Sequence, residues 1–210
     1  NNYYRLEEKK RLKLYGVITR ELLKCHAGQA MDIYWHRGHK YDVSENEYLQ
    51  MCAYKTGTLA RLAAKMGVVL GNGSEKQMNA LGKFAETIGV AFQIQDDILN
   101  LVGEEFQKGK GVGEDIHEGK RTLMVIHSLQ NGSQQDRERL VQILNSHPED
   151  EKTILEAIGI LKKNGSVEYA KKKADWLVQE AWKKINPVLS ESPAKKRLRL
   201  FAEYLIERNV

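Results

Sequence analysis

Proline is almost absent from this sequence, and its scarcity restricts the fold more than any other feature. The 210 residues contain three prolines, and all of them lie after position 147. Because proline removes a backbone donor and breaks helices, the preceding stretch can form long helices without kinks. Apolar residues recur there at helical spacing, and no period-two pattern of useful length indicates a strand. We therefore expect an all-α fold.

Capping signals and glycines divide the chain into its expected helices. Ser44 with Glu47 and Ser74 with Gln77 form capping-box patterns, which are typical of helix starts. Five glycines between positions 103 and 119 favour a loop over a stable helix. The expected helices span residues 5–34, 44–70, 74–102, 121–129, about twelve residues after 133, 150–163, 166–185 and 193–208. No repeat or low-complexity linker interrupts them, so we expect one domain over residues 1–210.

Composition excludes several classes of protein and leaves others open. The net charge of +5 favours anionic partners in general without selecting among them. Cys25 and Cys52 belong to no CxxC or Cys/His cluster, and two isolated cysteines suit a reducing compartment, so we expect a cytoplasmic protein. No stretch approaches the roughly 20 apolar residues that a membrane-spanning helix needs.

Two basic runs raise the possibility of nucleic-acid binding. They cover residues 171–173 and 195–197. Neither is accompanied by aromatic residues that could stack on bases or by a recognition motif. We interpret both runs as solvated helix faces and expect no nucleic-acid partner.

A polar stripe interrupts the otherwise apolar helix expected over residues 74–102. Gln93, Asp96, Asp97 and Asn100 fall within about a 100° arc of that helix. Two adjacent carboxylates on a largely buried helix are costly unless a charge compensates them. Mg²⁺ prefers carboxylate oxygens and also binds phosphate oxygens, so it is the natural compensating ion. A solvent-facing helix edge, or ion pairs with lysines, is the alternative.

The glycine-rich loop that follows carries cations suited to phosphate. Lys110 lies among its glycines, and Lys120 and Arg121 are expected at the start of the next helix, where the dipole favours an anion. The loop matches neither the P-loop nor the dinucleotide-binding fingerprint, and no strand precedes it.

Two further polar groups interrupt apolar helices. Gln29 and Asp32 are three residues apart and therefore share a helix face, and His36 lies on the same face. Lys55 and Thr56 lie in mid-helix, where a buried lysine needs an anion nearby. Surface positions are the alternative for each group.

In chain order, the motifs GQxxD, KTG, FQxxDDxxN, GKGVGxD and GKRT form a specific combination. Together they resemble the trans-isoprenyl diphosphate synthases of the polyprenyl synthetase family, most closely the short-chain geranylgeranyl diphosphate synthases. Residues 28–35 resemble the central GQxxDIYW segment of that family, and residues 96–100 resemble its second aspartate-rich motif. The resemblance covers essentially the whole chain.

The resemblance implies a helical isoprenoid-synthase bundle and a prenyltransferase of the geranylgeranyl or farnesyl type. Family members condense an allylic diphosphate with isopentenyl diphosphate, depend on Mg²⁺ and pair as homodimers. Transferred by position, the resemblance implies that the side chains act as follows: Asp96, Asp97 and Asn100 bind the metal; Lys55, Lys110, Lys120 and Gln29 bind diphosphate; and Lys55, Thr56 and Gln93 act in catalysis.

The chain departs from the family pattern at two points. Asn100 replaces the third aspartate of the second motif, and a neutral amide oxygen is a weaker ligand. No first aspartate-rich motif precedes Gly28, since residues 1–27 contain no aspartate. We therefore interpret the chain as the C-terminal part of a longer synthase whose N-terminal helices are missing here. The alternative is a non-catalytic partner subunit of a heteromeric synthase.

Overall fold

The computed structural model describes residues 6–40, 42–102 and 113–207, and within these ranges it contains helices and no strand. The expectation of an all-α fold is confirmed. The main helices are α1 (Glu8–Tyr34), α2 (Glu45–Cys52), α3 (Thr58–Leu70), α4 (Glu75–Val102), α6 (Glu114–His117), α7 (Leu123–Asn131), α8 (Gln134–Ser146), α9 (Glu151–Lys163), α10 (Ser166–Ile185) and α11 (Pro193–Glu207).

Both expected capping boxes form. Ser44 Oγ accepts the amide of Glu47, and a carboxylate oxygen of Glu47 accepts the amide of Ser44 at 2.9 Å. Ser74 and Gln77 make the same reciprocal pair. These bonds satisfy backbone donors that a helix start leaves unpaired, which explains why α2 and α4 begin where the sequence predicts.

Four local features differ from the sequence-based expectations. The helix expected over residues 44–70 is interrupted by a π-helical turn, η2 (Ala53–Gly57), between α2 and α3. A single helical turn, α6, lies within the loop expected over residues 103–119. Lys120 and Arg121 precede α7 instead of starting it, because Thr122 is its N-cap and accepts the amide of Val125. A second π-helical turn, η1 (Trp35–His39), follows α1.

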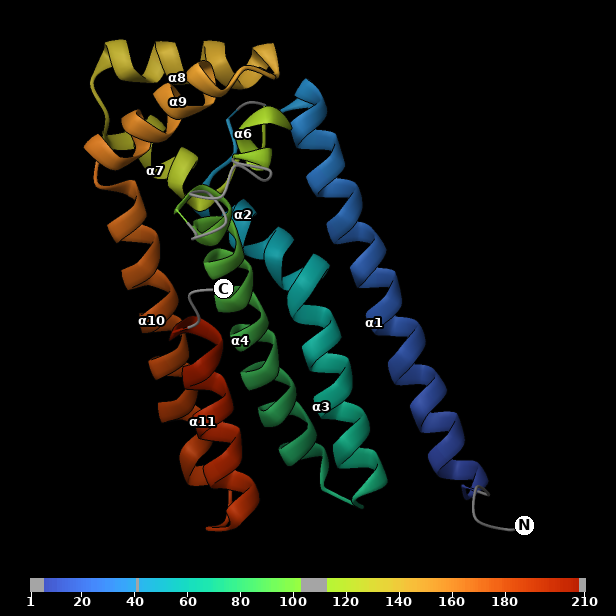
Figure 1. Cartoon of the computed structure of the whole chain (residues 1–210). Helices are drawn as coiled ribbons and strands as arrows, with labels where there is room; N and C mark the ends of the chain where they lie inside the picture. The colour runs from blue at the N-terminus through green and yellow to red at the C-terminus, as the bar shows by residue number, and fades with distance from the viewer. Residues whose placement is uncertain (1–5, 41, 103–112, 208–210) are drawn as a thin grey trace.

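Helix α4 lies at the centre of the arrangement. It packs between α3 and α10, α1 packs on the outer side of α3, and α11 contacts α4 and α10 (Figure 1). Helices α8 and α9 lie across one end of these long helices. The core holds large apolar side chains that are almost fully buried, namely Ile94, Ile98, Leu101, Met124, Leu140, Leu144, Leu161 and Ile185. No helix in the described ranges is long and apolar enough to cross a membrane.

Glycines allow three helical segments to cross at very short distances. A Cβ added to Gly28 of α1 would lie 2.3 Å from the backbone nitrogen of Lys55, and one added to Gly89 of α4 would lie 2.6 Å from the Cα of Gly57. Both contacts are far inside van der Waals distance, so only glycine fits. The crossing brings α1, η2 and α4 together directly beside Lys55 and Thr56.

A buried ion network joins α1, α3 and α4 further along the bundle. Glu21 is fully buried and accepts Arg61 Nε at 2.7 Å and Lys65 Nζ at 2.8 Å. Arg61 also pairs with Glu86 of α4. Because each buried charge has a partner of opposite sign, the network fixes the relative positions of the three helices without leaving an isolated ion.

Candidate functional site

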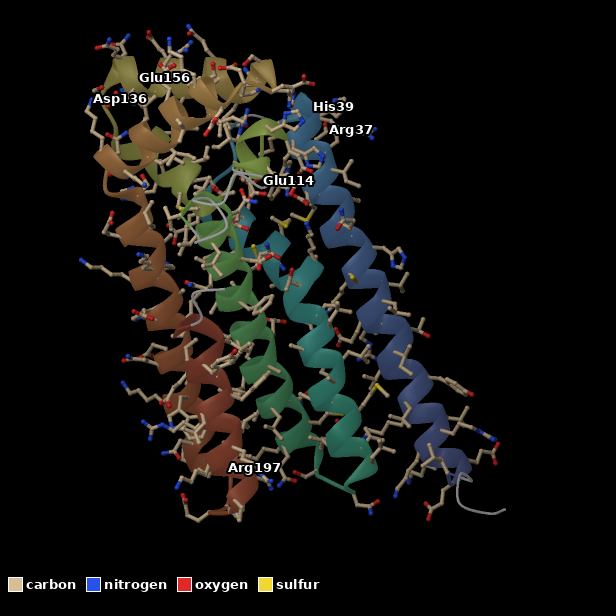
Figure 2. The ribbon with its side chains drawn as sticks, in the orientation of Figure 1. Arg37, His39, Glu114, Asp136, Glu156 and Arg197 are labelled. Carbon is tan, nitrogen blue, oxygen red and sulfur yellow. The ribbon has the colours of Figure 1, made fainter. Side chains whose placement is uncertain are left out.

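A small pocket lies where the end of α1, η2, the C-terminal half of α4 and the segment before α7 meet. Its volume is about 30 Å³, which leaves room for about one or two water molecules. Figure 2 shows Arg37, His39 and Glu114 at this end of the molecule and Arg197 at the other. The pocket is lined by Asp32, Trp35, His36, Tyr48, Met51, Lys55, Gln93, Asp97, Lys120, Arg121 and Thr122.

Asp97 is the buried carboxylate of this pocket, and a hydrogen-bonded chain orients it. The hydroxyl of Tyr48 donates to Asp97 Oδ2 at 2.7 Å, and Gln93 Nε2 donates to Oδ1 at 2.9 Å. Thr56 Oγ1 in turn donates to Gln93 Oε1 at 2.6 Å. Burial, followed by repulsion from Asp115, raises the pKa of Asp97 above its usual range. The site therefore favours a positive charge beside this carboxylate.

Two lysines approach the pocket, and each pairs with an aspartate. Lys55 Nζ lies 2.6 Å from Asp32 Oδ2, and Lys120 Nζ lies 2.8 Å from Asp115 Oδ1. Burial raises the pKa of Asp115 although Lys120 opposes the shift. Burial would lower the pKa of Lys120, but the attraction of Asp115 and Glu118 outweighs it and raises that pKa. The mid-helix Lys55 thus has the nearby anion that the sequence predicts.

The structure brings some of the predicted site residues together and separates others. Lys55, Gln93, Asp97 and Lys120 line one pocket, and Thr56 joins them through Gln93.

Gln29 and Asp96 do not line that pocket. Both side chains are exposed, Gln29 on α1 and Asp96 on α4, so the stripe predicted on α4 is buried at Asp97 and open at Asp96. Asn100 Oδ1 accepts the backbone amide of Asp115 at 3.1 Å, which engages the amide oxygen predicted to bind metal. Lys110 lies outside the described residues.

Two pocket residues were not singled out from the sequence. Tyr48 and Met51 contribute to the lining, whereas Trp35 and Thr122, which also line the pocket, belong to motifs noted in the sequence. Tyr48 precedes Lys55 by seven residues, which is two helical turns, so helical periodicity placed it near the lysine face. An aromatic residue at that spacing is ordinary core material, and only its contact with Asp97 distinguishes it.

The donor set suits a magnesium ion that is also bound by phosphate. Within the described ranges, no group of three or more His, Cys, Asp or Glu side chains is placed to hold a metal by itself. Mg²⁺ commonly takes one or two carboxylates and completes its shell with water and substrate phosphates. A buried carboxylate beside two lysines matches that chemistry, because the lysines can hold the phosphate oxygens.

Comparison with known proteins tests the resemblance that the motifs indicate. The sequence model described as Polyprenyl synthetase matches residues 2–161. A short chain isoprenyl diphosphate synthase of Methanothermobacter thermautotrophicus is 42% identical over 193 residues, which are 92% of this chain and 58% of that protein. The resemblance drawn from the motifs is confirmed.

Solved structures show the same fold. The geranylgeranyl pyrophosphate synthetase of Pyrococcus horikoshii Ot3 superposes with a TM-score of 0.86 at 34% identity, and covers 97% of this chain and 61% of its own. A geranylgeranyl pyrophosphate synthase of Corynebacterium glutamicum, complexed with isoprenyl diphosphate and magnesium, has a TM-score of 0.87 at 23% identity, with 97% of this chain and 57% of its own covered. The chain thus spans about three fifths of the length of these proteins.

Proposed function

Since the chain belongs to the polyprenyl synthetase family, we propose that it forms the diphosphate-binding part of a trans-prenyl diphosphate synthase. The whole protein condenses an allylic diphosphate with isopentenyl diphosphate and yields geranylgeranyl diphosphate. One observation carries this proposal: Asp97, Lys55 and Lys120 come from three distant segments and converge on one pocket. That combination of a carboxylate and two lysines is the chemistry that a metal-bound diphosphate requires.

Mg²⁺ is the proposed cofactor, with Asp96 and Asp97 as its carboxylate ligands. A magnesium ion neutralises the charge that develops on departing diphosphate and so makes it a better leaving group. Asp97 is oriented for this role by two donors, and Asp96 immediately precedes it on the same helix with an exposed side chain. Asn100 stays a predicted ligand, although its oxygen already accepts a backbone amide.

The two lysines hold the diphosphate oxygens by exchanging partners. Lys55 and Lys120 now lie against Asp32 and Asp115, which closes the pocket to anything larger than water. If the two lysines turned to a diphosphate, a bound divalent cation would compensate the charge of the carboxylates that they leave. Charges therefore remain paired on both sides of the exchange, which keeps the buried site from holding isolated ions.

Thr56 and Gln93 orient the reacting end of the substrate. Their side chains are already hydrogen-bonded to each other, and Gln93 is tied to Asp97. Both therefore sit next to the metal-binding carboxylate and supply polar oxygens near developing positive charge. Gln29 and Lys110 complete the set that the family pattern implies.

We extend the proposal to the state of the protein in the cell. The chain forms a single all-helical domain of a cytoplasmic homodimer that acts on small-molecule diphosphates. The family resemblance supports the homodimer, and the two isolated cysteines suit a reducing compartment. Size-exclusion chromatography with light scattering measures the oligomeric state, and a monomer at working concentration would contradict it.

A non-catalytic partner subunit is the competing proposal, and the site opposes it. A subunit freed from catalysis has no physical need for a buried carboxylate whose pKa is raised by burial beside two paired lysines. One turnover assay distinguishes the two proposed functions. A partner subunit makes no product alone but raises the turnover of a second synthase, whereas the proposed enzyme makes product by itself.

The decisive experiment assays the full-length protein with isopentenyl diphosphate and each allylic diphosphate, with product length measured by chromatography. The double variant Asp96→Ala/Asp97→Ala should lose Mg²⁺-dependent turnover, because both proposed carboxylate ligands are removed. Asp175→Ala, an exposed aspartate of α10, is the matched control and should behave as the wild type. Turnover retained in the double variant would refute the metal assignment.

A further inference from the structure

Tyr48 makes a contact that neither the motifs nor the comparisons assign. Its side chain is 1% exposed, and its hydroxyl donates to Asp97 Oδ2 at 2.7 Å. The two residues lie on different helices, α2 and α4, and are 49 positions apart. The bond therefore depends on how these helices pack and not on local sequence.

The surroundings hold the Tyr48 ring in place. The capping box of Ser44 and Glu47 fixes the start of α2 one turn before Tyr48. Cys52, one turn after it, is also fully buried. Because the ring is packed on all sides and α2 is anchored at its start, the hydroxyl can reach Asp97 without the loss of much further side-chain freedom.

The torsion of a carboxylate about its last bond is broad and roughly two-fold, so an aspartate alone does not present its oxygens at one angle. Asp97 has one donor on each oxygen, Tyr48 on Oδ2 and Gln93 on Oδ1. Each ionised oxygen can accept more than one bond, so both keep an acceptor site for a cation in the pocket. The pair of donors thus selects one orientation of the carboxylate.

We propose that Tyr48 is a positioning residue that orients the Asp97 carboxylate for a divalent cation bound together with diphosphate. The inference rests on the proposed function, since it needs Asp97 to bind metal. When a group that hydrogen-bonds to a metal ligand and orients it is removed, metal affinity usually falls by about 10- to 100-fold. Tyr48 acts through Asp97 and does not touch the substrate itself.

The chain offers a matched control for removing the Tyr48 hydroxyl. Tyr169 of α10 also donates its hydroxyl to a carboxylate, Glu45 Oε2, at 2.5 Å, and lines no part of the pocket. Tyr48→Phe and Tyr169→Phe each delete one hydroxyl and one tyrosine–carboxylate bond. A general effect of losing such a bond therefore appears in both variants, and an effect on metal binding appears in Tyr48→Phe alone.

The test measures Mn²⁺ binding by electron paramagnetic resonance in the full-length protein with inorganic pyrophosphate. Tyr48→Phe should weaken Mn²⁺ binding about 10- to 100-fold, and Tyr169→Phe should match the wild type. In steady-state assays, Tyr48→Phe should need more Mg²⁺ for half-maximal rate and should recover kcat at saturating Mg²⁺. Equal Mn²⁺ affinity in Tyr48→Phe and wild type would overturn the inference.

The Asp97→Ala variant separates this inference from the proposed function. If wild-type protein binds Mn²⁺ with pyrophosphate and Asp97→Ala does not, the metal site stands, and Tyr48→Phe then decides the inference by itself. If Asp97→Ala binds Mn²⁺ as tightly as the wild type, the metal assignment fails and the inference fails with it.

Discussion

Gly28 provides the sharpest test of how the pocket is built. The change is Gly28→Ala, which adds one methyl group to α1 where it crosses η2. The new Cβ would lie 2.3 Å from the backbone nitrogen of Lys55 and 2.6 Å from the carbonyl carbon of Tyr54. Because both atoms are backbone, no side-chain rotation relieves the contact, and the two segments must separate.

The size of the effect follows from that geometry. Ordinary contact begins near 3.4 Å, so the crossing must open by about 1 Å. Overpacking of this kind costs about 1–3 kcal/mol. Alanine is the better helix former by about 1 kcal/mol, which offsets part of the cost. Asp32, one turn beyond Gly28, moves away from its partner Lys55 as the crossing opens.

Gly16 supplies the matched control on the same helix. It is exposed, and a Cβ added there meets nothing within 4 Å. Gly16→Ala should therefore show the helix-propensity gain alone, a stabilisation of about 1 kcal/mol. Urea unfolding followed by circular dichroism gives the free energy of unfolding of both variants. The difference between them, about 1–3 kcal/mol, is the steric cost at the crossing.

If Gly28→Ala is as stable as Gly16→Ala, the close crossing of α1 and η2 does not exist as described.

Three further predictions concern the ion network, the start of α2 and the metal. Arg61→Met should lower the free energy of unfolding by about 1–3 kcal/mol, because buried Glu21 loses its guanidinium partner and keeps only Lys65. Adding Glu21→Gln should recover part of this loss in a double-mutant cycle. Ser44→Ala should cost about 1 kcal/mol in urea unfolding, through loss of the N-cap of α2. Lys40 and then Ser44 lower the pKa of Glu47 from 4.5 to about 2, so its contribution is complete above pH 4.5 and is lost as pH falls toward 2. The Glu47→Gln variant should lack this acid-dependent part of the urea midpoint. Mg²⁺ with pyrophosphate should raise Tm, and EDTA should reverse the rise, since binding to the folded state at 100 times Kd stabilises it by about 2.7 kcal/mol.

If the Arg61→Met/Glu21→Gln double variant has no higher free energy of unfolding than Arg61→Met alone, the two side chains are not energetically coupled. A Glu47→Gln protein with the acid profile of the wild type would place the titrating group elsewhere. If Mg²⁺ and pyrophosphate added together leave Tm unchanged, the proposed metal site loses its support.

The helices and their starts could be predicted from sequence because they depend on neighbouring residues. Apolar periodicity is set by the 3.6-residue repeat, and a capping box involves residues only three positions apart. The π-helical turn at Lys55 and Thr56 was not predictable in this way. It arises where η2 passes within backbone contact of α1 and α4, which only the glycines of three separate segments allow.

The candidate site was also only partly predictable from the sequence. Helical spacing placed Gln93, Asp96 and Asp97 on one side of α4, and the chain order of the motifs identified the family. The sequence could not show that Asp97 is buried and Asp96 is exposed. The angular position of a residue on its own helix does not tell which neighbouring helix packs against that residue.

What the sequence determined by itself is therefore local and compositional: an all-α chain, the helix boundaries to within a few residues, and the residue types for metal and diphosphate chemistry. The tertiary structure alone decided which of those residues meet. Tyr48 reaches Asp97 across 49 positions, Lys55 reaches Asp32, and Gln29 faces outward. The physical reason is that helix packing follows from the shapes of side chains on several distant segments at once, and no pattern within one segment records it.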